Sequence, residues 1–118
     1  ADPRVSWVSF PGLETDKYHA LAEKYMPNGT CGVISFGVPG GREKVSAFLD
    51  HLKMVSIATH VADARSCTLY PAGTTHRQLT EEQLEEAGVG IDLVRLSCGI
   101  ENTADIIADL DQALAAVQ

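Results

Sequence analysis

The chain has 118 residues, of which 45% are hydrophobic and 21% are charged, and its formal net charge is −7. This length and composition predict one globular domain, residues 1–118, with its own core. The acidic balance argues against nucleic acid and anionic membrane partners, which require a basic face, and the apolar runs are too short for a transmembrane helix.

Strand and helix signals alternate through the first half of the chain. Residues 4–10 alternate in polarity, which predicts a strand, and residues 15–26 have the apolar spacing of a helix that ends at the turn 27–29. Residues 31–38 predict a buried strand and residues 42–52 a second helix. The apolar face of the first helix consists of Tyr18, Leu21, Ala22 and Tyr25.

The second half begins with two adjacent strands and then resumes the alternation. Strands are predicted at 53–60 and 66–70, followed by a short helix over 80–88 that opens with a capping-box spacing. A strand at 92–99 then precedes the clearest helix, 102–117, which Asn102 caps. The predicted apolar stripe of that helix consists of Ile107, Leu110, Leu114 and Val117.

This order of elements predicts an α+β fold: a mostly antiparallel or mixed sheet with helices packed on one side. Side chains alternate between the two faces of a strand. In the strand at 92–99, Val94, Leu96 and Cys98 should therefore face the helix-covered core. Arg95 should emerge on the opposite face, and Gly99 should leave room there for backbone or ligand.

Several possible binding motifs are excluded by their spacing. The stretch "FGVPGGREK" at 36–44 lacks the Gly-Lys-Ser/Thr ending of a P-loop, so we interpret it as a strand-to-helix turn. The four histidines share no metal-ligand spacing with one another or with the cysteines, so we predict no metal site. His19 and His51 are expected to be solvated on helices, whereas His60 and His76 lie in or beside turns.

The three cysteines, Cys31, Cys67 and Cys98, are widely spaced and odd in number. An odd count disfavours a disulfide framework, and each cysteine lies in an apolar segment. We predict buried free thiols and a reducing, cytoplasmic setting.

Two interpretations of Arg95 remain open at this point. An arginine on the open face of a sheet is commonly just solvated. Alternatively, its guanidinium is a receptor for a carboxylate or phosphate, which it binds through two parallel hydrogen bonds.

Four ordered stretches resemble the C-terminal domain of the Cys/Met-metabolism family of pyridoxal-phosphate enzymes, and within it the O-acetylhomoserine sulfhydrylases. The stretches are "RVSWVSFPGLETD", "GVISFGVPGGREK", "HVADARSCTLYPAGTTHRQLTEEQ" and "GIDLVRLSCGIENTADIIADLDQAL". The resemblance covers nearly the whole chain. It implies the small C-terminal domain of a fold-type I enzyme that exchanges the acetate of O-acetylhomoserine for sulfide, giving homocysteine in methionine biosynthesis.

The resemblance also implies roles for individual residues. Arg95 would bind the α-carboxylate of the amino-acid substrate, and the loop from His60 to Asp63 would lie near the substrate. Many relatives have Ser or Asn in place of His60 and Gly in place of Ala62, so His60 matches in position but not in chemistry. The loop 74–76 would have a supporting role.

The cofactor site expected for this family is missing from the chain. Lys17, Lys24, Lys44 and Lys53 lie outside anything like the family's cofactor-lysine motif. The resemblance therefore implies that pyridoxal phosphate is bound by a separate, larger domain of the parent enzyme, and that this chain alone is inactive. It also implies that residues 1–118 pack on that larger domain, and that the parent enzyme is a homo-oligomer. An apolar interdomain patch including Trp7 and Phe10 should be exposed.

Two alternatives accompany this interpretation. One is a sister enzyme of the family, a cystathionine or methionine γ-lyase or a γ-synthase. The other is a non-catalytic α+β domain that binds a small molecule.

Overall fold

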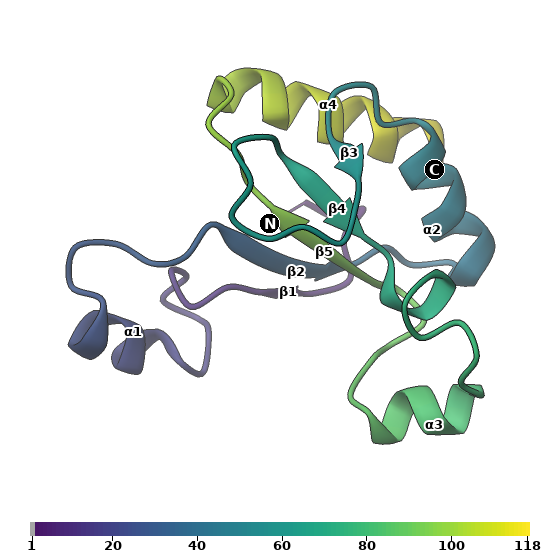
Figure 1. Ribbon diagram of the computed structural model, residues 1–118, viewed down its shortest axis with the longest axis horizontal. Coiled ribbons are helices and arrows are strands. Elements are labelled where there is room, and N and C mark those ends of the chain that lie inside the picture. Colours follow the sequence, from purple (N-terminus) through teal and green to yellow (C-terminus); the bar gives the residue numbers. More distant parts are fainter. Residues whose placement is uncertain (1) are drawn as a thin grey trace.

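The computed structural model of the chain describes residues 2–118, and its centre is a five-stranded sheet with the order β1-β2-β5-β4-β3 (Figure 1). The strands are β1 (Val8–Ser9), β2 (Val33–Gly37), β3 (Ser56–Ile57), β4 (Cys67–Leu69) and β5 (Leu93–Ser97). Neighbouring strands are antiparallel except for β3 and β4, which are parallel. The prediction of a mixed, mostly antiparallel sheet is confirmed.

Two of the helices cover one face of this sheet, as predicted. The helices are α1 (His19–Tyr25), α2 (Gly41–Asp50), α3 (Glu81–Glu86) and α4 (Thr103–Ala116), with a 3₁₀ turn, η1, at Pro71–Gly73. Figure 1 shows α2 and α4 together on one side of the sheet, whereas α1 and α3 project at its two ends. The opposite face is therefore free of helices within residues 2–118, and we call it the open face.

The core lies between the sheet and the helices α2 and α4. Val94 and Leu96 of β5 are buried, and their partners on β2 are Phe36 and Ile34. The helices contribute further buried side chains to the same cluster: Val45, Phe48, Leu49, Ala113 and Leu114. Because residues 94 and 96 belong to the core, the intervening residue of β5 must face the open side.

The glycine-rich stretch at 36–44 is a strand-to-helix turn, as predicted. β2 ends at Gly37 and α2 begins at Gly41. Gly40 and Gly41 have φ angles of +108° and +75°, which L-residues with a Cβ rarely adopt. The glycines are thus required by the backbone of the turn.

The predicted helix at 15–26 is shorter and more exposed than expected. The Asp16 carboxylate accepts hydrogen bonds from the backbone N–H groups of Phe10 and Tyr18, which holds the preceding residues in turns. Ala22 is the buried residue of α1, whereas Leu21 and Tyr25 are 51% and 69% exposed. The four residues of the predicted apolar face line one shallow depression, but only Ala22 among them is buried.

The predicted apolar stripe of α4 is wrong at Ile107. Asn102 caps this helix as expected, because its side chain accepts a hydrogen bond from the N–H of Ala104. Ile106 is buried, however, and Ile107 is 60% exposed. Leu110, Leu114 and Val117 do pack on the core, as predicted. The carboxylate of Asp109 also faces inward, where it accepts three backbone hydrogen bonds from the segment that precedes β3.

No helix in the described range 2–118 has both the length and the apolar character needed to cross a membrane.

Candidate functional site around Arg95

Strand β5 places Arg95 on the open face, as the sequence predicted. Its partners in the sheet are Ser35 on β2 and Leu69 on β4. Its two neighbours along the strand, Val94 and Leu96, are buried on the helix side. The guanidinium therefore lies on the side of the sheet that α2 and α4 leave uncovered.

The loop between β3 and β4, residues 58–66, runs across the open face and meets Arg95 there. Because β3 and β4 are parallel, the chain must return to the other end of the sheet between them. Arg95 Nη2 donates hydrogen bonds to the carbonyl oxygens of Thr59, at 3.0 Å, and His60, at 3.5 Å. The two residues predicted from the sequence, Arg95 and His60, thus meet through the backbone of His60, whose side chain is exposed.

Two further residues, Ser97 in β5 and Gly99 just after it, contact this loop. Ser97 was not among the site residues predicted from the sequence. The Ser97 hydroxyl accepts a hydrogen bond of 3.0 Å from the N–H of Ala62. Gly99 lies so close to the loop that a Cβ would stand 2.4 Å from the carbonyl oxygen of Ala64. The room predicted at Gly99 is therefore occupied by backbone. The spacing of two residues between Arg95 and Ser97 could have predicted that both side chains lie on the open face, because side chains alternate along a strand.

The end of the loop is anchored by a carboxylate. Glu101 accepts hydrogen bonds from the backbone N–H and the hydroxyl of Ser66, at 2.6 and 2.8 Å. The Ser66 N–H bond in particular lowers the pKa of Glu101. The pKa of Asp63 is also lowered, chiefly by a hydrogen bond from the backbone N–H of Arg65. Both carboxylates remain ionised at neutral pH.

A hollow opens beside the anchored loop, and Arg95 has an unsatisfied hydrogen-bond donor. The hollow has a volume of about 390 Å³ and includes Ala62, Asp63 and Ser97 in its lining, whereas Arg95 lies outside that lining. Arg95 Nε is the buried side-chain nitrogen that has no hydrogen-bond partner within residues 2–118. A buried donor without a partner is costly, and a guanidinium satisfies it best with a carboxylate or phosphate. The arrangement is therefore suited to binding an anionic group.

The other titratable candidates do not join this site. The Thr74 hydroxyl donates to the carbonyl of Tyr70, and the Thr75 hydroxyl lies 2.9 Å from His76 Nδ1, so the loop 74–76 satisfies its own polar groups. Cys67 is buried and Cys98 partly so, but Cys31 is exposed, which corrects the prediction of three buried thiols. Its position just before β2 leaves it outside the core.

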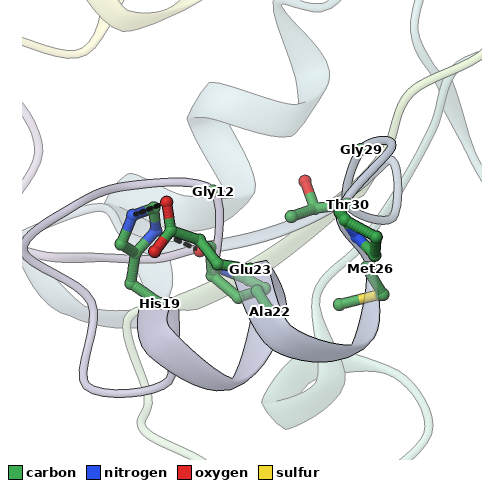
Figure 2. A pocket seen from close by; sticks show the side chains of 9 residues that line it. Gly12, His19, Ala22, Glu23, Met26, Gly29 and Thr30 are labelled. Carbon is green, nitrogen blue, oxygen red and sulfur yellow. Dashed lines mark hydrogen bonds and ion pairs between the residues drawn. The ribbon is translucent and has the colours of Figure 1, made fainter.

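His19 belongs to a separate depression beside α1 (Figure 2). The depression has a volume of about 470 Å³ and lies between the turn at Pro11–Gly12, the helix and the turn that follows it. His19 Nδ1 lies 2.9 Å from the carbonyl oxygen of Pro11, and Nε2 lies 3.6 Å from Glu23. His19 is thus partly buried and partnered rather than fully solvated as predicted, and neither partner belongs to the Arg95 site.

The four lysines of the chain are exposed or hydrogen-bonded within the chain. A Schiff-base lysine must reach the cofactor inside a shaped cavity. Lys17 and Lys24 are exposed, with their ammonium groups over the rings of the adjacent tyrosines. Lys44 Nζ donates to the carbonyl of Val117 on the helix side of the sheet, and Lys53 is exposed. The contacts of Lys17, Lys24 and Lys44 therefore lie away from Arg95 and the loop 58–66.

Comparisons with known proteins agree with the resemblance seen in the motifs. The chain is 45% identical over 113 residues to an O-acetyl-L-homoserine sulfhydrylase from Leptospira meyeri, covering 95% of this chain and 26% of the relative. It is 48% identical over 112 residues to a homocysteine synthase from Schizosaccharomyces pombe, with the same two coverages. The chain thus spans about a quarter of the length of these relatives.

A solved structure gives the same result for the fold. The cystathionine γ-synthase from Xanthomonas oryzae pv. oryzae, solved with aminoacrylate and cysteine, superposes with a TM-score of 0.89 at 36% identity. The match covers 99% of this chain and 30% of that one. The family model for Cys/Met metabolism PLP-dependent enzymes matches residues 1–115. The chain therefore belongs to the family of Cys/Met metabolism PLP-dependent enzymes.

Proposed function

We propose that residues 1–118 form the C-terminal, substrate-carboxylate-binding domain of an O-acetylhomoserine sulfhydrylase. The relatives named above, at 45% and 48% identity, support this substrate. The parent enzyme would replace the acetate of O-acetylhomoserine by sulfide, giving homocysteine in cytoplasmic methionine biosynthesis. This chain alone would be inactive, because it lacks the cofactor lysine.

The observation that carries the proposal is the unsatisfied Nε of Arg95 on the open face. The guanidinium is already oriented by two backbone carbonyls of the loop 58–66, so little freedom remains to be lost when an anion binds. A substrate α-carboxylate would complete its hydrogen bonding. The open face would close against the larger cofactor domain of the same polypeptide, within a homo-oligomer, and the exclusion of water would strengthen the pairing.

The first test is the kinetic effect of Arg95→Ala in the complete, cofactor-loaded enzyme. Truncating one member of a buried charge pair costs about 2–5 kcal/mol. kcat/KM for O-acetyl-L-homoserine with sulfide should therefore fall roughly 30- to several-thousand-fold. Arg95→Lys should recover only part of the activity, because an ammonium does not reproduce the planar fork.

The matched control for this test is Arg77→Ala, which removes an exposed arginine that belongs neither to β5 nor to the loop 58–66. Its kcat/KM should stay within twofold of the unchanged enzyme, and both Arg95 variants should keep the cofactor. A loss smaller than threefold in Arg95→Ala would show that the arginine is only a solvated residue of the sheet.

A second candidate function is that of a cystathionine γ-synthase, because a protein of that name shares this fold at a TM-score of 0.89. The two functions differ in the nucleophile that replaces the leaving group. We expect the complete enzyme to turn over O-acetyl-L-homoserine faster with sulfide than with cysteine. Faster turnover with cysteine would favour the γ-synthase, and turnover of methionine or cystathionine alone would favour a γ-lyase.

A further inference from the structure

We infer that Ser97 is a positioning residue for the carboxylate receptor, acting through the loop 58–66. The inference rests on the proposed function of Arg95, and it assigns the hydroxyl of Ser97 the task of holding the loop that orients the guanidinium. Ser97 itself does not touch the substrate.

Two sets of hydrogen bonds connect Ser97 to Arg95 through the loop 58–66. The Ser97 hydroxyl accepts the N–H of Ala62 at 3.0 Å, and the side chain is buried, with a residue exposure of 2%. Two residues before Ala62, the carbonyl of His60 accepts from Arg95 Nη2, as does that of Thr59. One strand thus holds one loop at two points, and the second point sets the orientation of the guanidinium.

The backbone of the loop needs this restraint. Ala62 has a φ of +57°, in the left-handed region that costs an L-residue roughly 1–2 kcal/mol. A hydrogen bond to the N–H of the strained residue stabilises that conformation against relaxation. Without it, we expect the loop to move and the carbonyls of Thr59 and His60 to leave Arg95.

The side chain of Ser97 has no role in the helix-covered core. Its partners in the sheet, Val33 and Cys67, also face the open side, whereas the core residues of β5 are Val94 and Leu96. Removing the hydroxyl should therefore disturb the loop rather than the packing of the domain.

The kinetic test compares Ser97→Ala with Ser46→Ala, an exposed serine on α2, in the complete enzyme. The loss of one hydrogen bond that orients the receptor should raise KM for O-acetyl-L-homoserine roughly three- to tenfold. kcat should stay within twofold, because the reacting atoms are untouched. Ser97→Thr, which keeps the hydroxyl, should return KM most of the way, and Ser46→Ala should change neither constant.

A second measurement uses the unchanged 118-residue chain and does not depend on a variant that folds. Amide hydrogen exchange measured by NMR should be slower at Ala62 than at Val61, because the Ala62 N–H is hydrogen-bonded to a buried hydroxyl. In Ser97→Ala, exchange at Ala62 should accelerate while exchange in α2 stays the same.

Three results would overturn the inference: equal exchange at Ala62 and Val61, an unchanged KM in Ser97→Ala, or a loss confined to kcat. A failure of the proposed function looks different. In that case Arg95→Ala has less than a threefold effect, while the exchange at Ala62 still reports whether Ser97 holds the loop.

Discussion

At the scale of single residues, the site depends on a backbone conformation that its own sequence disfavours. Ala62 has a φ of +57°, and it is the non-glycine residue with positive φ within residues 2–118. The resemblance to the family pointed to glycine as the common residue at this position. Glycine adopts such angles without a steric penalty, although it loses more conformational freedom on folding. The alanine therefore leaves the loop strained where it contacts Ser97.

We predict that Ala62→Gly stabilises the folded chain. Relief of roughly 1–2 kcal/mol of left-handed strain exceeds the 0.5–1 kcal/mol entropic cost of a glycine, so the free energy of unfolding should rise by about 0.5–1 kcal/mol. Urea unfolding at pH 7 measures the change. The matched control is Ala64→Gly in the same loop, which has no strain to relieve and should lower the free energy of unfolding. A similar loss in both variants would contradict the strain at Ala62.

At the scale of elements, one buried carboxylate joins α4 to the segment between α2 and β3. Asp109 Oδ1 accepts from the N–H of Lys53, and Oδ2 accepts from those of Met54 and Val55, all at 2.9 Å. Burial alone would raise the pKa of Asp109, but the backbone donors outweigh it and the pKa is lowered. This attachment explains why a carboxylate lies on the buried face of α4, beside Ile106 and Ala113.

We predict that Asp109→Ala lowers the free energy of unfolding by about 2–4 kcal/mol at pH 7, because it leaves backbone donors unsatisfied in a buried place. Asp105→Ala, an exposed carboxylate in the first turn of the same helix, should lose at most about 1 kcal/mol of helix-dipole interaction. Urea unfolding of both variants measures the difference, and equal losses would argue against the anchoring role.

The same carboxylate should make stability depend on pH. Because the folded-state pKa of Asp109 is lowered, its contribution is complete above the unfolded pKa of about 3.9 and is lost as the pH falls through the folded value. The difference in unfolding free energy between the unchanged chain and Asp109→Ala should therefore shrink when both are measured at pH 3 instead of pH 7. A constant difference would show that the pKa of Asp109 is the same in the folded and unfolded states, so that the backbone donors do not lower it.

At the scale of the whole molecule, the chain exposes more apolar surface than its own fold covers. An apolar groove of about 160 Å³ lies between α4 and the strands β1, β2 and β5, lined by Val5, Val8, Ile34, Phe36, Leu96, Leu110 and Leu114. Val8 is 48% exposed and Trp7 is 38% exposed, whereas Phe10 is partly buried. Contiguous exposed apolar surface is typical of a face that packs on another domain or chain.

We predict that the 118-residue chain binds a hydrophobic dye and self-associates at high concentration. Ile107→Gln removes an exposed apolar side chain from α4 and should lower dye binding without lowering Tm. Ile106→Gln, one residue away but buried, should lower Tm instead. Dye fluorescence, sedimentation and thermal unfolding separate these effects. A strict monomer that binds no dye would contradict the prediction.

The order of strands and helices followed from local signals, because helical and strand periodicity depends on residues close together in the chain. The same reasoning placed Arg95 opposite the core, since residues 94 and 96 already belonged to it. The caps at Thr80 and Asn102 were equally predictable, because each bonds a group within three residues. These features did not require knowledge of which strands are neighbours.

The tertiary structure alone decided what Arg95 meets. Its contacts with Thr59 and His60 and the contact of Ser97 with Ala62 join residues about 35 positions apart, and they exist because β3 and β4 are parallel and the loop between them returns over β5. The inward turn of Asp109 was likewise hidden, because a hydrophobic pattern treats every carboxylate as a surface group. Such contacts depend on strand order and on long-range partners, which periodicity does not encode.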